Sequence, residues 1–112
     1  MAKVQHYKVR RHNKYNARKT WIDGHRFDSM REARRYQDLK LLERAGEIHN
    51  LRLQVAYPLL LEAVTLGKYI ADFVYWEDKE LIIEDCKGVR TPLYRWKKKH
   101  FQLQYNTIIK ET

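Results

Sequence analysis

Two apolar runs separated by three polar residues constrain the fold of this chain more than any other feature of its sequence. Residues 69–76 are rich in aromatic and β-branched side chains, and residues 81–87 form a second apolar run, so both favour strands. The intervening Glu77-Asp78-Lys79 is too short for a crossover, which predicts an antiparallel hairpin. A third strand is expected over residues 51–57, where apolar and polar side chains alternate. Pro58 should then break or bend that strand, or place it at a sheet edge.

A helix is expected on either side of these strands. The first should span residues 29–45, because Ser29 with Glu32 three positions later is a capping-box pattern. Gly46 then favours the left-handed conformation in which helices often end. The second should span residues 92–105, where a threonine precedes a proline suited to the first helical turn.

Two short elements complete the expected order. Residues 20–27 should form a hairpin with Asp23-Gly24 at its turn, and residues 107–110 a last strand. This order is typical of an α/β fold in which a mixed sheet is flanked by helices. A length of 112 residues is that of one domain. We therefore expect a single domain over residues 20–112, preceded by a flexible basic arm of residues 1–19.

The charge balance indicates a polyanionic partner. A formal net charge of +9 and a sequence pI near 9.7 suit nucleic acid or an anionic membrane. No apolar run approaches the ~20 residues that span a bilayer, and the first twenty residues lack the apolar segment of a secretory signal. The single cysteine, Cys86, excludes an internal disulfide and a cysteine-based zinc site. These features predict a cytoplasmic protein that binds nucleic acid.

The basic arm is the first candidate contact with nucleic acid. Residues 1–20 contain seven Lys or Arg and no acid, which suits contact with phosphates. A tail that only adds solubility is the alternative. The cations expected to bind nucleic acid from this arm are Arg10, Arg11, Lys14, Arg18 and Lys19.

Two aspartates lie where strand composition disfavours them. Asp72 interrupts the first apolar run, and Asp85 lies inside the second. Burying a carboxylate that is neither paired nor bound to metal costs on the order of several kcal/mol. Two such carboxylates on neighbouring strands are most simply explained by a shared divalent cation, and Mg²⁺ takes one or two carboxylates with waters and substrate phosphates. We therefore expect Mg²⁺ (or Mn²⁺) here. A structural salt bridge with Lys87 is the alternative.

Lys87 completes a set of residues suited to hydrolysis of a phosphodiester. In a strand, Asp85 and Lys87 would point to one face, because they are two positions apart, with Glu84 on the opposite face as a structural or interface acid. A metal ion neutralises charge and helps to form hydroxide, while a lysine stabilises negative charge that develops on a phosphate. Cys86, between them, is expected to be a small core residue rather than a nucleophile.

These residues resemble a known nuclease signature. Ala71-Asp72 followed by Asp85-Cys86-Lys87 looks like the PD-(D/E)XK motif, with alanine in place of the first proline and the two acids 13 positions apart. The chain is also similar to a phage and prophage family of Holliday-junction-resolvase-like proteins. That wider resemblance covers roughly residues 14–110 and rests on the stretches 27–33, 69–76 and 84–89.

The resemblance implies a restriction-endonuclease-like core and a metal-dependent DNA endonuclease. Asp72 and Asp85 would be metal ligands, Lys87 the catalytic lysine, and the backbone carbonyl of Cys86 a further ligand. Such nucleases often carry a helical glutamate before the sheet, which Glu32 matches. A helix cap alone is the other interpretation of Glu32, although this residue falls on the face expected to pack against the sheet.

The resemblance also implies a substrate and an assembly. Branched DNA, cut as by a Holliday junction resolvase, would require paired cuts and hence a C2 homodimer, in the host cytoplasm if the protein is phage-encoded. Trp76 would serve such an interface or pack in the core. No small-molecule cofactor and no membrane are expected. The rivals are a non-catalytic nucleic-acid-binding protein on a nuclease fold and a nuclease that acts on linear DNA.

A second cluster of cations, interleaved with aromatic residues, follows the second acid. A solvated helix face is one interpretation, and contact with phosphates beside the active site is the favoured one. Gln54, on the strand before the hairpin, is a further candidate for lining the site. The cations of this cluster are Arg90, Arg95, Lys97, Lys98 and Lys99.

Overall fold

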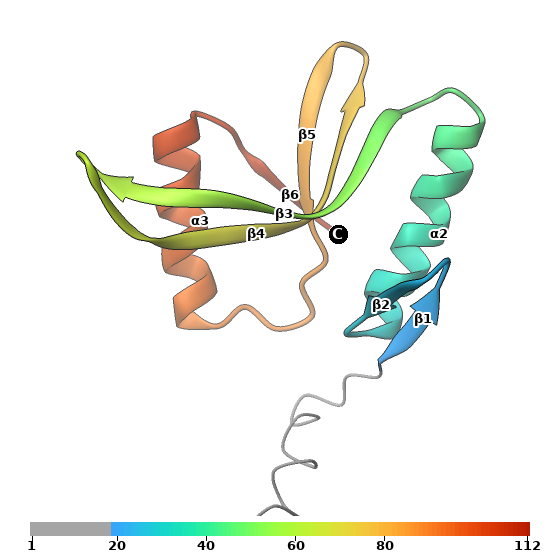
Figure 1. Cartoon of the computed structure of the whole chain (residues 1–112), viewed down its shortest axis with the longest axis horizontal. Helices are drawn as coiled ribbons and strands as arrows, with labels where there is room; N and C mark the ends of the chain where they lie inside the picture. Colours follow the sequence, from blue (N-terminus) through green and yellow to red (C-terminus); the bar gives the residue numbers. More distant parts are fainter. Residues whose placement is uncertain (1–18) are drawn as a thin grey trace, which may run out of the picture.

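The computed structural model describes residues 19–112, which form two sheets and two helices (Figure 1). In chain order the elements are β1 (Thr20–Ile22), β2 (His25–Phe27), α2 (Met30–Arg44), β3 (His49–Leu61), β4 (Val64–Glu77), β5 (Glu80–Asp85), α3 (Pro92–Tyr105) and β6 (Ile109–Glu111). Four of the cations predicted to bind DNA lie outside the described residues: Arg10, Arg11, Lys14 and Arg18.

The first elements follow their sequence signals. β1 and β2 pair antiparallel, and Asp23 and Gly24 turn between them with φ angles of 53° and 79°. Ser29 caps α2, because its side-chain oxygen accepts the backbone N–H of Glu32 at 3.2 Å. Gly46 follows the helix with a φ of 82°, the left-handed conformation expected there. The predicted hairpin and the predicted first helix are both confirmed.

The larger sheet has the strand order β3-β4-β5-β6 and is mixed, since β6 runs parallel to β5 while the other pairs are antiparallel. The predicted α/β architecture, a mixed sheet flanked by helices, is confirmed. Asp78 and Lys79 make the predicted turn between β4 and β5 with positive φ angles. Pro58 lies inside β3, an edge strand, so the edge position is the right expectation. β5 ends at Asp85, so the expectation that Lys87 belongs to this strand is wrong.

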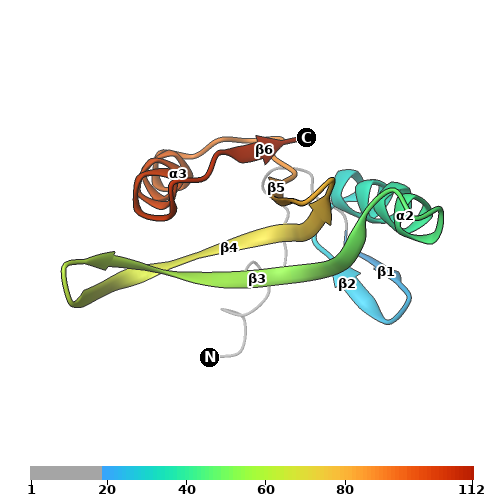
Figure 2. The ribbon, with the colours of Figure 1, turned by 90° about the horizontal axis from the view of Figure 1, so that it is seen from above.

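Each helix packs on its own cluster of buried side chains, and Figure 2 shows α2 and α3 at opposite ends of the long β3–β4 hairpin. The buried members of the α3 cluster are Leu59, Tyr69, Ala71, Val74, Ile83, Tyr94, Phe101 and Ile109. Those of the α2 cluster are Phe27, Ala33, Tyr36, Leu39, Ile48, Phe73 and Tyr75.

The alternation of side chains between the two faces of the sheet reverses in β3 and in β4 where the two clusters meet. Leu53 packs against the α2 cluster and Val55 against the α3 cluster, although residues two apart in a regular strand share a face. The reversal falls at Gln54 on β3, whose φ is 52°, and at Asp72 on β4. A left-handed conformation costs a non-glycine residue on the order of 1 kcal/mol. The flanking register places Gln54 opposite Asp72, so the strained position adjoins a predicted metal ligand.

Side chains of α3 bind the backbone of β3 along its outer edge. Gln104 accepts the N–H of Leu60 at 2.8 Å and donates to the carbonyl of Pro58 at 3.1 Å. The Tyr105 hydroxyl donates to the same carbonyl at 2.7 Å. His100 Nε2 lies 2.7 Å from the Leu60 carbonyl oxygen. These bonds fix α3 against this end of the hairpin.

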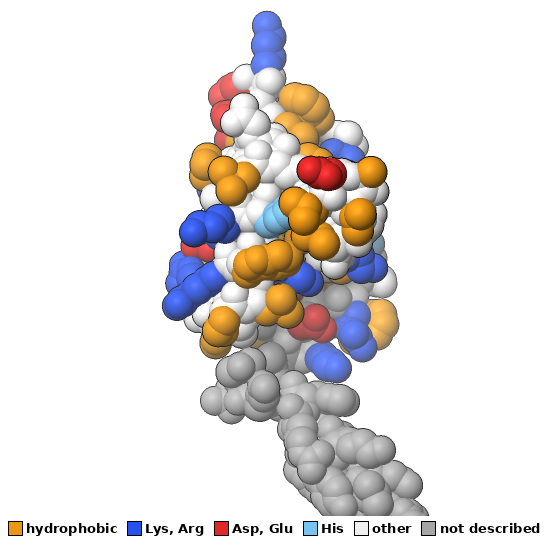
Figure 3. Space-filling view, turned by 90° about the vertical axis from the view of Figure 1, so that its left-hand side faces the viewer, with side chains coloured by type: hydrophobic (Ala, Val, Ile, Leu, Met, Phe, Trp, Pro, Cys, Tyr) orange, Lys and Arg blue, Asp and Glu red, His pale blue; other side chains and the backbone are white. Residues whose placement is uncertain are grey.

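Apolar side chains gather on the surface at the end of the molecule where α3 and the β3–β4 turn lie (Figure 3). The exposed residues from these elements include Leu61, Val64, Leu66, Leu93, Trp96 and Leu103. Trp76, at the other end of β4, is 41% exposed, so it is not a core residue of this chain. Within residues 19–112, neither helix has the length and apolar character needed to cross a membrane.

Candidate active site

The two predicted acids lie side by side on β4 and β5. The register that pairs Phe73 with Glu84 continues to place Asp72 opposite Asp85. Asp72 Oδ2 accepts the backbone N–H of Cys86 at 2.9 Å. Because Cys86 directly follows Asp85, this bond holds the Asp72 side chain next to Asp85. Asp85 is fully buried, whereas Asp72 is only partly buried. The structure therefore brings together the pair that the sequence predicts.

One carboxylate oxygen of Asp85 has no hydrogen bond within the described part of the chain. The hydroxyl of Tyr69 donates to Oδ2 at 2.6 Å, but Oδ1 has no hydrogen-bond partner among the described residues, and the nearest cation, Lys87 Nζ, lies 3.7 Å away. Burial, and next the neighbouring Asp72, raise the pKa of Asp85 to about 7. An unsatisfied buried acceptor costs about 1–3 kcal/mol. A fold that keeps such an oxygen beside a second carboxylate has a donor set that fits a hard cation.

Glu32 reaches this pair from α2. Its side chain is nearly buried, and its Oε2 accepts the Gln54 amide N–H at 3.0 Å, while the same nitrogen lies 3.3 Å from Asp72 Oδ1. Burial, and next the charge of Asp72, raise the pKa of Glu32 to about 8. A role as helix cap alone does not explain this arrangement, because the carboxylate bonds to Gln54 on β3 rather than to its own helix.

Lys87 lies in the loop after β5, yet it stays close to Asp85. Its ammonium is 3.7 Å from Asp85 Oδ1 and 4.6 Å from the centroid of the Tyr94 ring. The aromatic face attracts the cation and holds it over α3. The side chain is 28% exposed, so the ammonium remains accessible to a substrate. The ion pair with Asp85, which the sequence left as an alternative role for Lys87, is present but long.

The site offers as many carboxylates as Mg²⁺ usually binds, but these carboxylates do not form a closed cage around an ion. Within residues 19–112, no three His, Cys, Asp or Glu side chains are close enough to form a metal site by themselves. Mg²⁺ does not require such a cage, because it keeps several waters and binds one or two carboxylates together with phosphate oxygens. Asp72 and Asp85 would hold the ion directly, with Glu32 nearby. The predicted ligation by the carbonyl of Cys86 stays a prediction.

Glu84 faces away from this site, as expected, and is structural. It is fully buried and accepts hydrogen bonds from Arg35 (2.5 and 3.1 Å), the Tyr75 hydroxyl (2.5 Å) and the Thr112 hydroxyl (2.9 Å). Burial alone would raise the pKa of Glu84, but the hydrogen bonds from Arg35 and Tyr75 lower it. Cys86 packs against the α2 cluster, and burial raises its thiol pKa to about 11, which suits a core residue.

The predicted cations after the second acid divide into three groups. Lys97 lines a hollow of about 270 Å³ together with Lys68 and Lys87, next to the acids. Arg90 and Lys98 instead form ion pairs with Glu111 at 3.0 and 3.1 Å, so Arg90 ties the loop before α3 to β6, and Lys98 ties α3 itself to β6. The remaining predicted cations of the described part are exposed: Lys19, Arg95 and Lys99.

Sequence reasoning missed Tyr69 and Tyr94. Tyr69 is three positions before Asp72, a spacing that puts two side chains on opposite faces of a regular strand. Only the reversal at Asp72 brings Tyr69 to the acids, and no sequence pattern signals that reversal. Gln54 was a candidate for lining the site, and the structure connects it to Glu32 and Asp72.

Comparison with known proteins gives a single match. A family model described as "Protein of unknown function (DUF1064)" matches residues 12–111, a span that contains Glu32, Gln54, Asp72, Asp85 and Lys87. No curated protein and no solved structure matches the chain.

Proposed function

The chain belongs to the DUF1064 family, and we propose that this member is a metal-dependent DNA endonuclease with a restriction-endonuclease-like core. The observation that carries the proposal is the pair of adjacent carboxylates, Asp72 and Asp85, of which the buried one keeps an oxygen that accepts no hydrogen bond from residues 19–112. Lys87 lies beside that oxygen, where a phosphate could also reach it. Paired acids and a lysine in this arrangement suit phosphodiester hydrolysis.

The protein's own residues hold the reacting groups in place before a substrate arrives. When bound, Mg²⁺ or Mn²⁺ would neutralise charge and supply an activated water. Asp72 is fixed by the Cys86 N–H, and Asp85 by the Tyr69 hydroxyl. Such preorganisation avoids reorganisation during the reaction. Lys87 stabilises negative charge on the phosphate, and Glu32, with a pKa near 8, can exchange a proton close to neutral pH.

The charge of the chain supports DNA as the partner. A net charge of +9 attracts a polyanion, and the hollow lined by Lys68, Lys87 and Lys97 adjoins the acids. We further propose branched DNA as the substrate and the cytoplasm as the location, in line with the resolvase-like resemblance. The apolar end formed by α3 and the β3–β4 turn offers a surface on which a second copy could form the C2 dimer that paired cuts require.

A cleavage assay tests the proposal. The substrates are a four-way junction, a linear duplex and single-stranded DNA, each with EDTA, Mg²⁺ or Mn²⁺. The wild type should nick the junction in pairs only with metal, Asp85→Ala should abolish cleavage, and Asp38→Ala, which removes an exposed acid of α2, should cleave normally. Cleavage of all three DNAs would support the nuclease proposal but exclude the resolvase subclass. Tight binding in EDTA, with no cleavage by the wild type under any condition, would identify a non-catalytic binder instead.

A further inference from the structure

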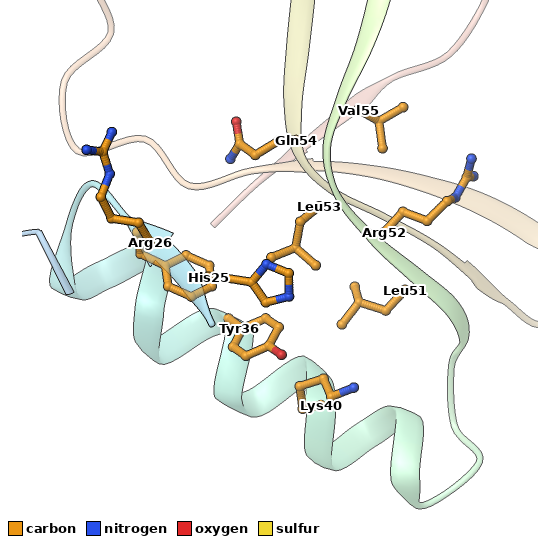
Figure 4. A pocket seen from close by; sticks show the side chains of 10 residues that line it. His25, Arg26, Tyr36, Lys40, Leu51, Arg52, Leu53, Gln54 and Val55 are labelled. Atoms are coloured by element: carbon orange, nitrogen blue, oxygen red, sulfur yellow. The ribbon is translucent and has the colours of Figure 1, made fainter. Parts of the chain in front are cut away.

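A groove of about 650 Å³ lies between the β1–β2 hairpin, α2 and β3. Gln54 lines one part of it and also bonds to Glu32 and lies beside Asp72, so the groove adjoins the candidate active site. In Figure 4, Gln54 and Arg26 lie toward one end of the groove and Lys40 toward the other. A strand that passes over the acids would therefore meet this groove next.

The groove combines positive charge with an apolar floor. Arg26, Lys40 and Arg52 line it, and none of its ten lining residues is an acid. Lys40 pairs with Glu43 at 3.1 Å and Arg26 with Asp28 at 3.8 Å, but Arg52 forms no ion pair with any residue from 19 to 112. The apolar floor consists of Phe27, Leu51 and Leu53 from the α2 side of the sheet, whereas Val55, at the edge of the groove, packs against the α3 cluster. Phosphate groups suit the first set of residues, and base surfaces suit the second.

An aromatic ring is exposed in the same groove. The imidazole of His25 contacts the buried ring of Tyr36 edge-on, with the centroids 5.8 Å apart, while His25 itself is exposed. Figure 4 shows the two rings next to each other, with Leu51 and Leu53 directed toward the same space from β3. Unpaired bases stack on exposed rings of this kind, and the bases of a duplex cannot, because they are already stacked on one another.

We propose that this groove binds an unpaired stretch of DNA next to the bond that is cut, so that, among branched DNAs, the enzyme prefers those with unpaired nucleotides at the branch to a fully paired four-way junction. The role of the groove in choosing a substrate rests on the proposed nuclease function. The binding of single-stranded DNA in the groove does not. A duplex presents phosphates outward and would leave the apolar floor and His25 unused. The volume lies within the ~300–1,000 Å³ of pockets that enclose one small ligand, which suits one or two nucleotides.

Binding is measured first, in EDTA, so that cleavage plays no part. Fluorescence anisotropy with a labelled oligothymidylate and with a blunt duplex compares the wild type, Arg26→Ala/Arg52→Ala, His25→Ala and the control Arg34→Ala/Arg44→Ala. The control removes the same charge from exposed positions of α2 that do not line the groove. The groove double variant should lose at least tenfold in affinity for the single strand, and His25→Ala at least threefold, with less than threefold loss for the duplex. Equal losses for both DNAs, or losses equal to those of the control, would overturn the proposal.

Cleavage then separates this proposal from the nuclease assignment. With Mn²⁺, the wild type should cut a splayed duplex with unpaired arms at least tenfold faster than a blunt one, and the groove double variant should lose that preference. If the wild type cuts but the groove variant keeps its preference, the groove proposal is wrong and the nuclease stands. If the wild type cuts no DNA while the groove double variant still loses affinity for single-stranded DNA, the groove proposal is supported and the nuclease proposal is wrong. Thermal unfolding confirms that each variant is folded.

Discussion

The hydroxyl of Tyr69 donates a 2.6 Å hydrogen bond to Oδ2 of Asp85 and leaves Oδ1 of that carboxylate directed toward Lys87. This bond lowers the pKa of Asp85 against the effect of burial. Tyr69→Phe removes a hydrogen bond to a charged group, worth about 1.5–3 kcal/mol. We expect the single-turnover cleavage rate at pH 7 to fall at least tenfold and to recover partly at pH 9, because a higher pH ionises the less stabilised carboxylate.

Tyr57→Phe is the matched control for that rate measurement. Tyr57 lies on β3 in the α3 cluster, and its hydroxyl contacts none of the site acids. This variant should cleave at the wild-type rate. A rate and pH profile for Tyr69→Phe that match those of Tyr57→Phe would show that the bond to Asp85 has no part in the reaction.

The metal-free protein should become less stable as the pH rises from about 4 to 8. Burial raises the pKa of Asp85 from 3.8 to about 7 and that of Glu32 from 4.5 to about 8. The unfolded chain therefore releases these protons at lower pH than the folded chain, so stability is lost across this window. In EDTA, the melting temperature should be several degrees lower at pH 8 than at pH 5.5. Asp85→Asn should remove part of this slope and melt higher than the wild type at pH 8, and a lower melting temperature there would contradict the interpretation.

Mn²⁺ should stabilise the protein more at pH 8 than at pH 6. A cation binds the ionised carboxylates of Asp72 and Asp85, and a larger fraction of Asp85 is ionised at pH 8. At a hundredfold excess over its dissociation constant, a ligand adds about 2.7 kcal/mol. Differential scanning fluorimetry at both pH values measures the rise in melting temperature. Asp85→Asn should abolish most of this rise, and an equal rise in that variant would place the metal elsewhere.

Glu84→Gln should destabilise the fold. Asp85→Asn, at the next residue, should instead stabilise it at pH 8. Glu84 is fully buried and receives hydrogen bonds from Arg35, Tyr75 and Thr112, so its charge is compensated. The neutral variant leaves the Arg35 guanidinium without its partner, which should cost about 2–3 kcal/mol. Urea unfolding at pH 7 measures the difference. A variant as stable as the wild type would show that Arg35 finds sufficient solvation elsewhere.

Features encoded in adjacent residues could be predicted from the sequence. The turn at Asp23-Gly24, the cap at Ser29 and the end of α2 at Gly46 depend on the conformational preferences of a few neighbours, and all three are present. The same holds for the hairpin that brings Asp72 to Asp85, since its turn allows only one direction of pairing. The acid pair was therefore predictable from strand composition and loop length alone.

Features that depend on distant contacts could not be predicted. In the sequence, apolar and polar residues alternate regularly over residues 51–57, so nothing there indicates the reversal at Gln54. In the structure, that reversal divides the apolar side chains of this segment between the two clusters. The hydrogen bond from Gln54 to Glu32 joins residues 22 positions apart on different elements. The same reversal directs Tyr69 to Asp85, 16 positions away. These contacts depend on how the strands and helices meet, which periodicity does not encode.

The bonds between α3 and the edge of β3 have a consequence for self-association. β3 is a strand of 13 residues at the edge of its sheet, and long open edges act as templates for fibril growth. Pro58 has no N–H to offer an incoming strand, and Gln104 already occupies the N–H of Leu60 and the carbonyl of Pro58. This stretch therefore cannot add another strand unless α3 first detaches, so aggregation by edge pairing here requires partial unfolding.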